Sequence, residues 1–182
     1  MSALTKFLTG PDRHLFVWIN RRIRCGPLDK FMAISTMLGS TGFALAMSII
    51  LLAAGKFSAS NVGLEVAATL ALSQLTVQTL KRLIDRPRPY MSFDGAIFRK
   101  PPSCRYSFPS GHTCAAFAIA LPLASAYPVI APFVLGIACM VGLSRIYLGF
   151  HYPTDVLAGF AIVAYTHSHL PLQLMETLSG MF

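Results

Sequence analysis

The chain has 182 residues, of which 54% are hydrophobic and only 12% are charged, and its 15 basic and seven acidic side chains give a net charge of +8. About a quarter of the residues of a soluble domain are charged, so this composition excludes an ordinary soluble enzyme. The positive balance is compatible with nucleic acid, but no basic patch interleaved with aromatic residues is found, so we expect no nucleic-acid partner. The length predicts one domain, residues 1–182.

The N-terminal segment, residues 1–30, is predicted to lie at a membrane surface. Charged residues interrupt every apolar patch of residues 1–24, so no signal-peptide core is expected. Residues 15–23 (LFVWINRRI) combine apolar side chains with an arginine pair, a pattern typical of an interfacial amphipathic helix. Gly26-Pro27 is predicted to end that helix.

Long uncharged stretches follow, and a membrane-spanning helix needs roughly 20 such residues. We predict spans at about 31–54 and 62–80, and a last span that starts at Pro153 and ends near residue 170. The 32 uncharged residues 113–144 are predicted to form two helices that turn at Tyr127-Pro128. The sequence therefore predicts an all-α, multi-pass transmembrane bundle of about five spanning helices. Residues 81–109 form a long proline-rich connection typical of a functional loop.

The cysteines do not form a recognisable metal or disulfide pattern. Cys25, Cys104, Cys114 and Cys139 include no CxxC pair and no Cys/His cluster at zinc spacing. We interpret all four as structural, and we expect no metal, no cofactor and no required disulfide.

Three patches at the edges of the uncharged stretches carry the candidate chemistry, and they span residues 81–155. In Pro109-Ser110-Gly111-His112, serine is a preferred N-cap, and the free N–H groups of a helix start bind anions. An ordinary capped helix is the alternative. His112 favours the site, because a histidine in the first turn of a span has no routine structural role.

His151 and Asp155 are four residues apart at the start of the last span. A carboxylate there can reach back to the imidazole, fix its tautomer and stabilise its charged form. The alternative is that Asp155 only complements the helix dipole.

Lys81, Arg88 and Arg145 sit near segment ends, where basic side chains also contact lipid headgroups. We prefer that second interpretation for Arg82, Arg99 and Lys100. Arg88 lies between two prolines that stiffen its backbone, and arginine suits bidentate phosphate recognition.

Taken together, the three patches resemble the signature motifs of the type 2 phosphatidic acid phosphatase superfamily, in order and at the family's spacing. The resemblance implies that His151 attacks phosphorus, that Asp155 orients it, and that His112 protonates the leaving oxygen. It implies that phosphate is bound by Lys81, Arg88, Ser110, Gly111 and Arg145. Vanadium-dependent haloperoxidases have a similar site but are soluble, and larger relatives have a sixth span that this chain lacks.

The predicted function is hydrolysis of a phosphate on a membrane lipid through a phosphohistidine. Polyprenyl diphosphate, phosphatidylglycerophosphate and phosphatidate all remain open as substrates. The alternatives are a lipid-to-lipid phosphotransferase and a non-catalytic lipid-binding relative. The expected partners are the lipid substrate and the bilayer, and the oligomeric state stays open.

Two arguments on the sidedness of the site conflict. With five spans, the N-terminal segment and the site share one face of the cell membrane. The positive-inside rule places that face in the cytoplasm, since it carries six N-terminal basic residues against Lys56 alone on the other face. Relatives that recycle lipid carriers usually face outward. We favour the cytoplasmic site.

Overall fold

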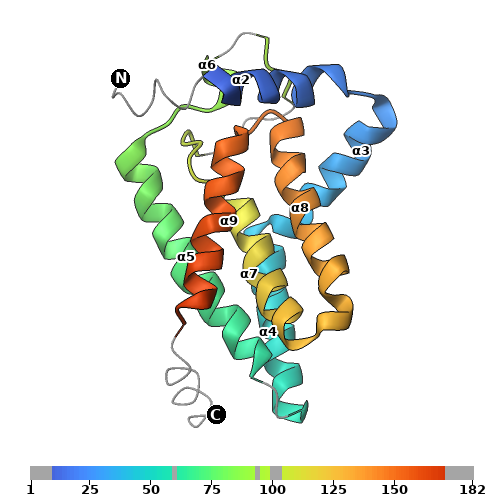
Figure 1. The fold of residues 1–182 in the computed structure, drawn as a ribbon, viewed down its shortest axis with the longest axis vertical. Helices are drawn as coiled ribbons and strands as arrows, with labels where there is room; N and C mark the ends of the chain where they lie inside the picture. Colours follow the sequence, from blue (N-terminus) through green and yellow to red (C-terminus); the bar gives the residue numbers. More distant parts are fainter. Residues whose placement is uncertain (1–9, 59–60, 93–94, 99–103, 171–182) are drawn as a thin grey trace.

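The computed structural model describes residues 10–58, 61–92, 95–98 and 104–170. In these ranges the chain is helical apart from turns and one isolated antiparallel bridge, between Pro87 and Tyr106. Figure 1 shows a bundle of long helices with shorter segments across one end. The elements are α2 (Gly10–Val17), η1 (Trp18–Arg22), α3 (Gly26–Ser35), η2 (Thr36–Gly39), α4 (Thr41–Ser58), α5 (Val62–Ile84), α6 (Pro89–Ser92), α7 (Gly111–Ala126), η3 (Pro128–Ile130), α8 (Ala131–Tyr147) and α9 (Pro153–Ser168).

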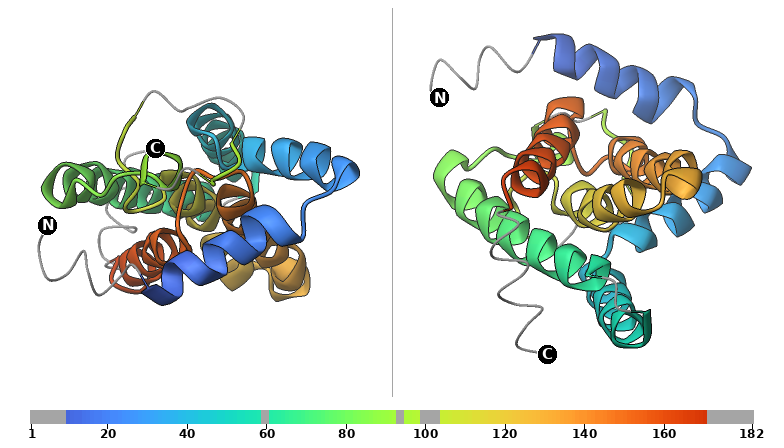
Figure 2. Two further views of the ribbon diagram at one scale, coloured as in Figure 1. Left: turned by 90° about the horizontal axis from the view of Figure 1, so that it is seen from above. Right: turned by 60° about the horizontal axis from the view of Figure 1, so that its bottom comes forward.

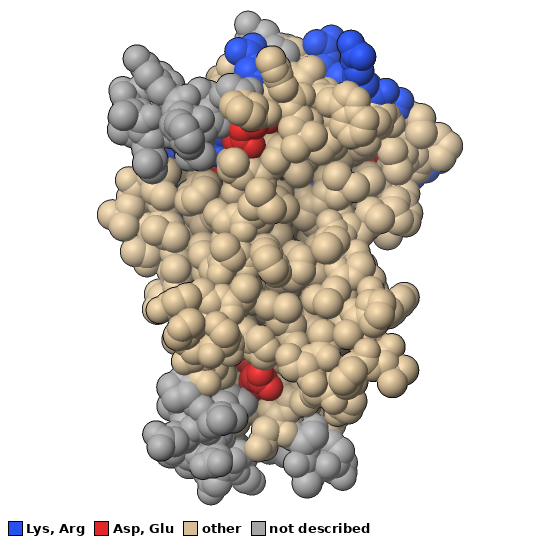
Figure 3. Space-filling view, viewed as in Figure 1, with Lys and Arg blue, Asp and Glu red and all other residues tan. Residues whose placement is uncertain are grey.

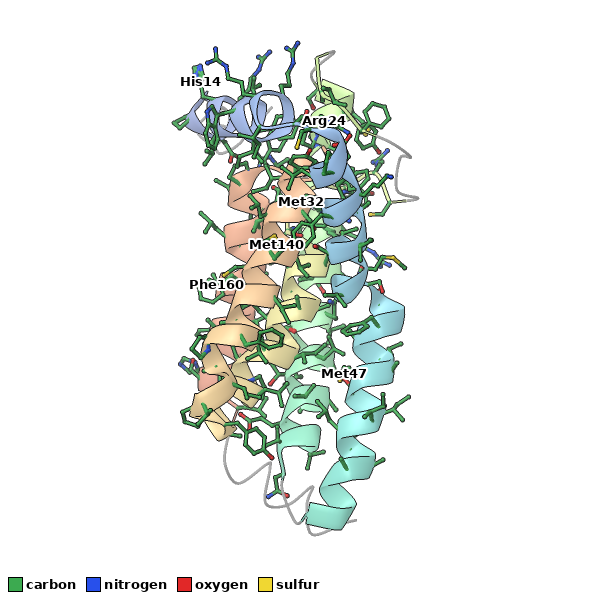
Figure 4. All side chains as sticks on the ribbon, turned by 90° about the vertical axis from the view of Figure 1, so that its right-hand side faces the viewer. His14, Arg24, Met32, Met47, Met140 and Phe160 are labelled. Carbon is green, nitrogen blue, oxygen red and sulfur yellow. The ribbon has the colours of Figure 1, made fainter. Side chains whose placement is uncertain are left out.

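Helix α2 and the short π-helix η1 lie across the end of the bundle, where the sequence predicts an amphipathic helix (Figures 1 and 4). Phe16 and Ile19 are buried against the loop and helix ends below them, whereas Leu15 and Trp18 are about half exposed. The side chain of His14 points away from the bundle in Figure 4. One side of this segment therefore packs on the rest of the protein, and Leu15 and Trp18 leave an apolar edge exposed.

The stretch predicted as a span at about 31–54 is not one straight helix. Helices α3 and α4 are separate and meet at an angle of 52°, with the η2 turn and an extended Ser40 between them. The chain packs tightly on α7 at this break, since a β-carbon at Gly39 would lie 2.7 Å from the carbonyl oxygen of His112. Gly26-Pro27 also begins α3 rather than simply ending the segment before it, since proline suits a first helical turn.

The remaining helices follow the sequence closely. Residues 113–144 form two helices, α7 and α8, which separate at Tyr127-Pro128 as predicted. Helix α9 starts at Pro153. Helix α5 continues one turn past the predicted end and stops at Asp85, whose φ of 44° is left-handed. Lys81 therefore lies inside a helix rather than in the connection that follows it.

Helix α7 occupies the centre of the bundle, with α5, α8 and α9 around it (Figure 2). It is buried on all sides over most of its length and is rich in alanine. Two neighbours approach its start through glycine: a β-carbon at Gly159 would lie 2.7 Å from the carbonyl oxygen of Ser110, and one at Gly142 would lie 3.6 Å from the Thr113 side chain. Small residues let helices pack this closely, which holds the start of α7 rigidly.

Of the residues that the structure describes, the stretch Pro128–Tyr147 alone forms a helix long and apolar enough to cross a membrane by itself. The bent pair Gly26–Gly39 and Thr41–Gly55 meets the same test as one broken span, and Gly111–Ala126 is apolar but shorter. Helix α5 carries Glu65, Lys81 and Arg82 near its ends. The count of five spans remains a prediction.

Candidate active site

The eight residues that the sequence predicts for the site lie at one end of the bundle, at the ends of α5, α7, α8 and α9 and in the loops beside them (Figure 1). Six of them are buried, and Gly111 and His112 are half-buried. The buried ones are Lys81, Arg88, Ser110, Arg145, His151 and Asp155. The glycine and the histidine therefore border the accessible side of the cluster.

The loop between α8 and α9 turns back on itself and so brings His151 next to Arg145. The carbonyl oxygen of Arg145 accepts hydrogen bonds from the N–H groups of Phe150 (3.0 Å) and His151 (3.2 Å). The turn requires Gly149, whose φ is +81°, and a β-carbon there would lie 2.5 Å from the carbonyl oxygen of Ile97. This backbone geometry fixes the position of the imidazole.

The contacts of the His151 ring indicate its tautomer. Its Nε2 lies 3.2 Å from Nη1 of Arg88, and an arginine can only donate, so Nε2 is the acceptor and the proton is on Nδ1. Nδ1 lies 3.5 Å from Oδ2 of Asp155, which is long for a hydrogen bond, and no other described residue offers it a partner. Burial, reinforced by the charge of Arg145, lowers the pKa of His151 to about 3, so the ring is neutral and Nε2 is unprotonated, with its lone pair directed at Arg88.

Asp155 is fully buried, and both of its carboxylate oxygens accept hydrogen bonds. Oδ1 accepts from Nη1 of Arg86 at 2.6 Å, while Oδ2 accepts from the Tyr152 N–H at 2.7 Å and from the Ser107 hydroxyl. Its main-chain oxygen accepts from the Ser110 N–H at 2.9 Å, which ties α9 to the start of α7. The carboxylate is therefore held in one orientation behind the imidazole.

Arg86 links Asp155 to the N-terminal helix, a connection that the sequence analysis missed. Its Nη2 donates to Oδ2 of Asp12 at 2.6 Å, and Asp12 also accepts from the Thr154 N–H at 3.0 Å. Burial disfavours the charged guanidinium, but the two carboxylates outweigh that cost and raise the pKa of Arg86. Asp12 lies in a segment whose charges we interpreted only as breaks in an apolar run, so no sequence signal pointed to this role.

Lys81, Arg88 and Arg145 differ from Arg86, because none of them forms an ion pair with a carboxylate in the described part of the chain. Neutral groups brace them instead: Arg88 donates to the carbonyl oxygens of Phe150 (2.8 Å) and Cys104 (2.7 Å). Nη1 of Arg145 donates to the Thr36 hydroxyl at 2.7 Å, and Nε of Arg145 is buried without a hydrogen-bond partner among the described residues. The cluster thus concentrates positive charge and unused donors, as an anion site does.

The start of α7 completes the cluster. Ser110 caps the helix, since its hydroxyl accepts from the N–H (3.4 Å) and the hydroxyl (2.9 Å) of Thr113. A β-carbon at Gly111 would lie 3.6 Å from Nζ of Lys81. The free N–H groups in the first turn of α7 therefore lie beside this cation. Among the described residues, no three His, Cys, Asp or Glu side chains gather as a metal site would require.

The family model of the PAP2 superfamily matches residues 62–177. The chain is 34% identical over 155 residues to phosphatidylglycerophosphatase B of Bacillus subtilis, covering 74% of this chain and 70% of that protein. It is also 34% identical over 110 residues to the lipid A 1-phosphatase of Rhizobium johnstonii, covering 58% of this chain and 45% of that protein. The chain belongs to the PAP2 superfamily.

Solved structures of PAP2 membrane phosphatases have the same fold. The structure of Aquifex aeolicus LpxE matches with a TM-score of 0.77 and 30% identity, covering 86% of this chain and 92% of that one. A transmembrane PAP2-type phosphatidylglycerolphosphate phosphatase from Bacillus subtilis matches with a TM-score of 0.74 and 26% identity, covering 98% and 92%. This chain is therefore a membrane-embedded lipid phosphatase that hydrolyses phosphate esters.

The match to the PAP2 model contains all three predicted patches, but it begins at residue 62. Asp12 and Thr36, which contact Arg86 and Arg145, lie before it. Their contacts became visible only once the fold brought the N-terminal third of the chain to the site.

Proposed function

We propose that this PAP2 phosphatase hydrolyses a lipid phosphate through a phosphohistidine on His151. The observation that carries the proposal is the group of three buried cations, without carboxylate partners among the described residues, beside the unprotonated Nε2 of His151. A phosphate in that position would satisfy the cations and would bring its phosphorus to the nucleophile. Phosphoryl transfer depends mainly on such positioning and charge stabilisation.

The proposed reaction has two steps. Nε2 of His151 forms a bond to phosphorus while the bond from phosphorus to the lipid oxygen breaks, and His112 in its protonated, imidazolium form gives that oxygen its proton and becomes neutral. Water then attacks phosphorus, His112 takes the proton of the water, and the N–P bond breaks to release inorganic phosphate. Asp155 stabilises the positive charge that develops on the His151 ring.

Lys81, Arg88 and Arg145 would bind the phosphate oxygens, together with the Ser110 hydroxyl and the Gly111 N–H. Ser110 can do so because its hydroxyl accepts from Thr113 and keeps its own proton to donate. These side chains supply the charge stabilisation, so we propose that the reaction needs no metal ion.

The first substrate to test is phosphatidylglycerophosphate, because the B. subtilis relative named for it covers most of this chain and the B. subtilis structure named for it covers 98%. We propose to assay phosphate release by the purified protein in detergent from this lipid, phosphatidate, lipid A 1-phosphate and undecaprenyl diphosphate. Release that persists in EDTA and is inhibited by vanadate supports the mechanism. Transfer of phosphate to another lipid without release would instead identify a phosphotransferase.

The intermediate itself can be trapped. With ³²P-labelled substrate and rapid acid-free denaturation, a base-stable and acid-labile label should appear on the protein. The label should be absent from His151→Ala. A label that survives in this variant would contradict the assignment of the nucleophile.

We further propose five membrane crossings, with the active-site end in the cytoplasm, on the positive-inside argument. Cys25 is exposed at that end and can serve as the only cysteine after the other three are replaced. An impermeant maleimide should label it only after permeabilisation, while a cysteine at exposed Asn61, across the bundle, should react in intact cells. The reverse pattern would show a site that faces outward.

A further inference from the structure

Asn20 is a polar residue on the buried side of the N-terminal segment. It lies in η1, and its side chain is fully buried on the same side of the segment as the apolar Phe16 and Ile19. A buried amide costs folding free energy unless its hydrogen-bonding groups are satisfied. A leucine, branched at the same carbon, would be buried without that cost. The amide at this position therefore points to the groups that it binds.

The Asn20 amide binds main-chain groups from two distant parts of the chain. Its Nδ2 donates to the carbonyl oxygens of Ile97 and Tyr147, both at 2.8 Å, and its Oδ1 accepts from the Ile97 N–H at 2.8 Å. The N–H of Ile97 can only donate, which fixes the orientation of the amide. With its oxygen and its nitrogen both engaged, Asn20 clamps two segments together.

Both segments gain a partner from this clamp. Residues 95–98 form no helix or strand, and Asn20 binds the N–H and the carbonyl of Ile97 as a neighbouring antiparallel strand would. Tyr147 is the last residue of α8, where the carbonyl groups have no N–H partner inside the helix. Asn20 therefore satisfies an end of α8 and holds the loop beside it.

The two clamped segments flank the turn that carries His151. Helix α8 ends at Tyr147, and the turn follows it. On its other side the turn packs on Ile97, because a β-carbon at Gly149 would lie 2.5 Å from the Ile97 carbonyl oxygen. The same oxygen accepts from Nδ2 of Asn20. The turn thus lies between two carbonyl groups whose positions Asn20 fixes.

Two groups of the proposed chemistry depend on the position of this turn. His151 lies two residues after Gly149, and its N–H donates to the carbonyl oxygen of Arg145 at 3.2 Å. The carbonyl oxygen of Phe150 accepts from Nη1 of Arg88 at 2.8 Å, and the same nitrogen lies 3.2 Å from Nε2 of His151. A shift of the turn would therefore move the nucleophile and a phosphate-binding cation.

A second contact joins the N-terminal segment to α8 without involving the turn. The Tyr147 hydroxyl donates to Oδ1 of Asp29 at 2.8 Å and accepts from the Cys25 N–H at 3.3 Å. This contact holds the same two parts of the molecule together through a side chain of α8. Its removal should loosen the N-terminal segment and leave the Asn20 clamp in place, which makes it a matched control.

We propose that Asn20 is a positioning residue for phosphoryl transfer. By holding Ile97 and Tyr147, it fixes the turn between α8 and α9 and so aligns Nε2 of His151 with the phosphorus of a bound lipid phosphate. This inference rests on the proposed function, because it takes His151 as the nucleophile. Asn20 acts through the turn rather than on the phosphate. It lies before residue 62, where the match to the family model begins.

The kinetic test compares Asn20→Leu with Tyr147→Phe. Asn20→Leu keeps a side chain branched at the same carbon and removes the hydrogen bonds of the clamp. With phosphatidylglycerophosphate in detergent, its kcat should fall about tenfold, since small misplacements of catalytic groups can cost up to about 10²-fold. Its KM should be unchanged, because Lys81 and Arg145 keep their places on α5 and α8. Tyr147→Phe should match wild type in kcat and KM, even where its melting temperature falls as far.

A spectroscopic test measures the position of the His151 ring without turnover. The ring ¹⁵N resonances that are absent from His151→Gln should shift in Asn20→Leu and stay at their wild-type values in Tyr147→Phe. This measurement also separates the two proposals. If His151→Ala remains active, or if wild type hydrolyses no lipid, the proposed function is wrong, whereas a shift in Asn20→Leu alone still supports the clamp.

Unchanged kcat and resonances in a folded Asn20→Leu would overturn the proposal. Equal losses in Asn20→Leu and Tyr147→Phe would also overturn it, because docking of the N-terminal segment would then be what supports turnover. Asn20→Ala is measured alongside, since a water molecule can enter the space it leaves and hydrogen-bond to the freed main-chain groups. It should lose kcat in the same way. If neither variant folds, Asn20 stabilises the whole bundle rather than the turn, and the proposal is wrong.

Discussion

Each end of the bundle has a histidine–carboxylate pair, and the two pairs differ in everything around them. At the active-site end, Nδ1 of His151 lies 3.5 Å from Asp155. At the other end, Nδ1 of His167 lies only 3.0 Å from Oε1 of Glu65, and its Nε2 lies 3.1 Å from the Ser125 hydroxyl. Serine, histidine and carboxylate thus meet in the order of a catalytic triad, at the end of the bundle away from the phosphate site.

Surroundings distinguish the two pairs more than distance does. The side chains of His151 and Asp155 are 2% and 0% exposed, whereas those of His167 and Glu65 are 18% and 27% exposed. Basic side chains gather at the α2 end in Figure 3. Under the proposed mechanism a histidine–carboxylate pair alone does not make a site, and the cations that would hold a phosphate against the ring make the difference.

The sharpest test of this difference is His151→Ala. Removing the nucleophile should lower kcat by at least about 10⁴-fold, as expected for a group that forms the covalent bond. Activity is measured as phosphate release from phosphatidylglycerophosphate, and thermal unfolding in detergent shows whether the fold is intact. Retention of more than a small fraction of the activity in a folded variant would remove His151 from the mechanism.

Lys81→Ala should cost about 10²-fold in kcat, because loss of one preorganised donor to a transition-state oxygen costs about that much. Arg82 is a matched control, since it is the next residue of the same helix and is exposed. Arg82→Ala should stay within about twofold of wild type, as surface charges contribute little. Similar losses in both variants would mean that net charge alone, rather than the position of Lys81, supports activity.

Asp12→Asn tests whether the Asp12–Arg86 contact helps to position Asp155 behind His151. It keeps the side-chain shape but removes one of the two carboxylates on Arg86, so that Arg86 holds Asp155 less firmly. We expect kcat to fall about tenfold, because small misplacements of catalytic groups can cost up to about 10²-fold. KM should be unchanged and Asp12→Glu should restore part of the rate. A fall in thermal stability without any change in kcat would indicate a purely structural residue.

The protonation of His151 gives a pH test. Its pKa in the folded protein, about 3, lies below the usual value of about 6.5, so the unfolded chain binds the proton more readily. This group stabilises the fold above pH 6.5, and the contribution is lost as pH falls toward 3. In ¹⁵N-histidine spectra the resonances that disappear in His151→Gln should report a neutral, Nδ1-protonated ring at pH 5. A charged ring at that pH would contradict the buried, cation-flanked environment.

The smallest effect is expected at the other pair. His167→Ala should leave kcat/KM within about twofold of wild type and should lower stability by no more than about 1 kcal/mol, since the ion pair is partly exposed. Hydrolysis and thermal unfolding are measured on the same samples. A loss of activity comparable to that of Lys81→Ala would show that the His167–Glu65 pair takes part in turnover, and would contradict the proposed difference between the two pairs.

Sequence patterns predicted the helices and the local motifs of this protein well, because both depend on residues that are close in the chain. Proline at Pro153 and the Tyr127-Pro128 turn set helix boundaries locally. The break between α3 and α4 was not predicted in this way, and at it Gly39 makes a close contact with α7, far along the chain. The partnership of Asp12 with Arg86 joins residues 74 positions apart, and such pairs become visible only after the chain has folded.

The contact between Asp12 and Arg86 also has a practical consequence for where the protein can be cut. A fragment trimmed to the matched region, residues 62–177, would keep every signature motif and yet lose one counter-charge of Arg86 and the Thr36 hydroxyl on Arg145. Such a fragment would contain all the predicted catalytic and phosphate-binding residues but would lack two of the contacts that position Arg86 and Arg145. The smallest active fragment of this protein should therefore be larger than the region that matches the family model, and it should begin before Asp12.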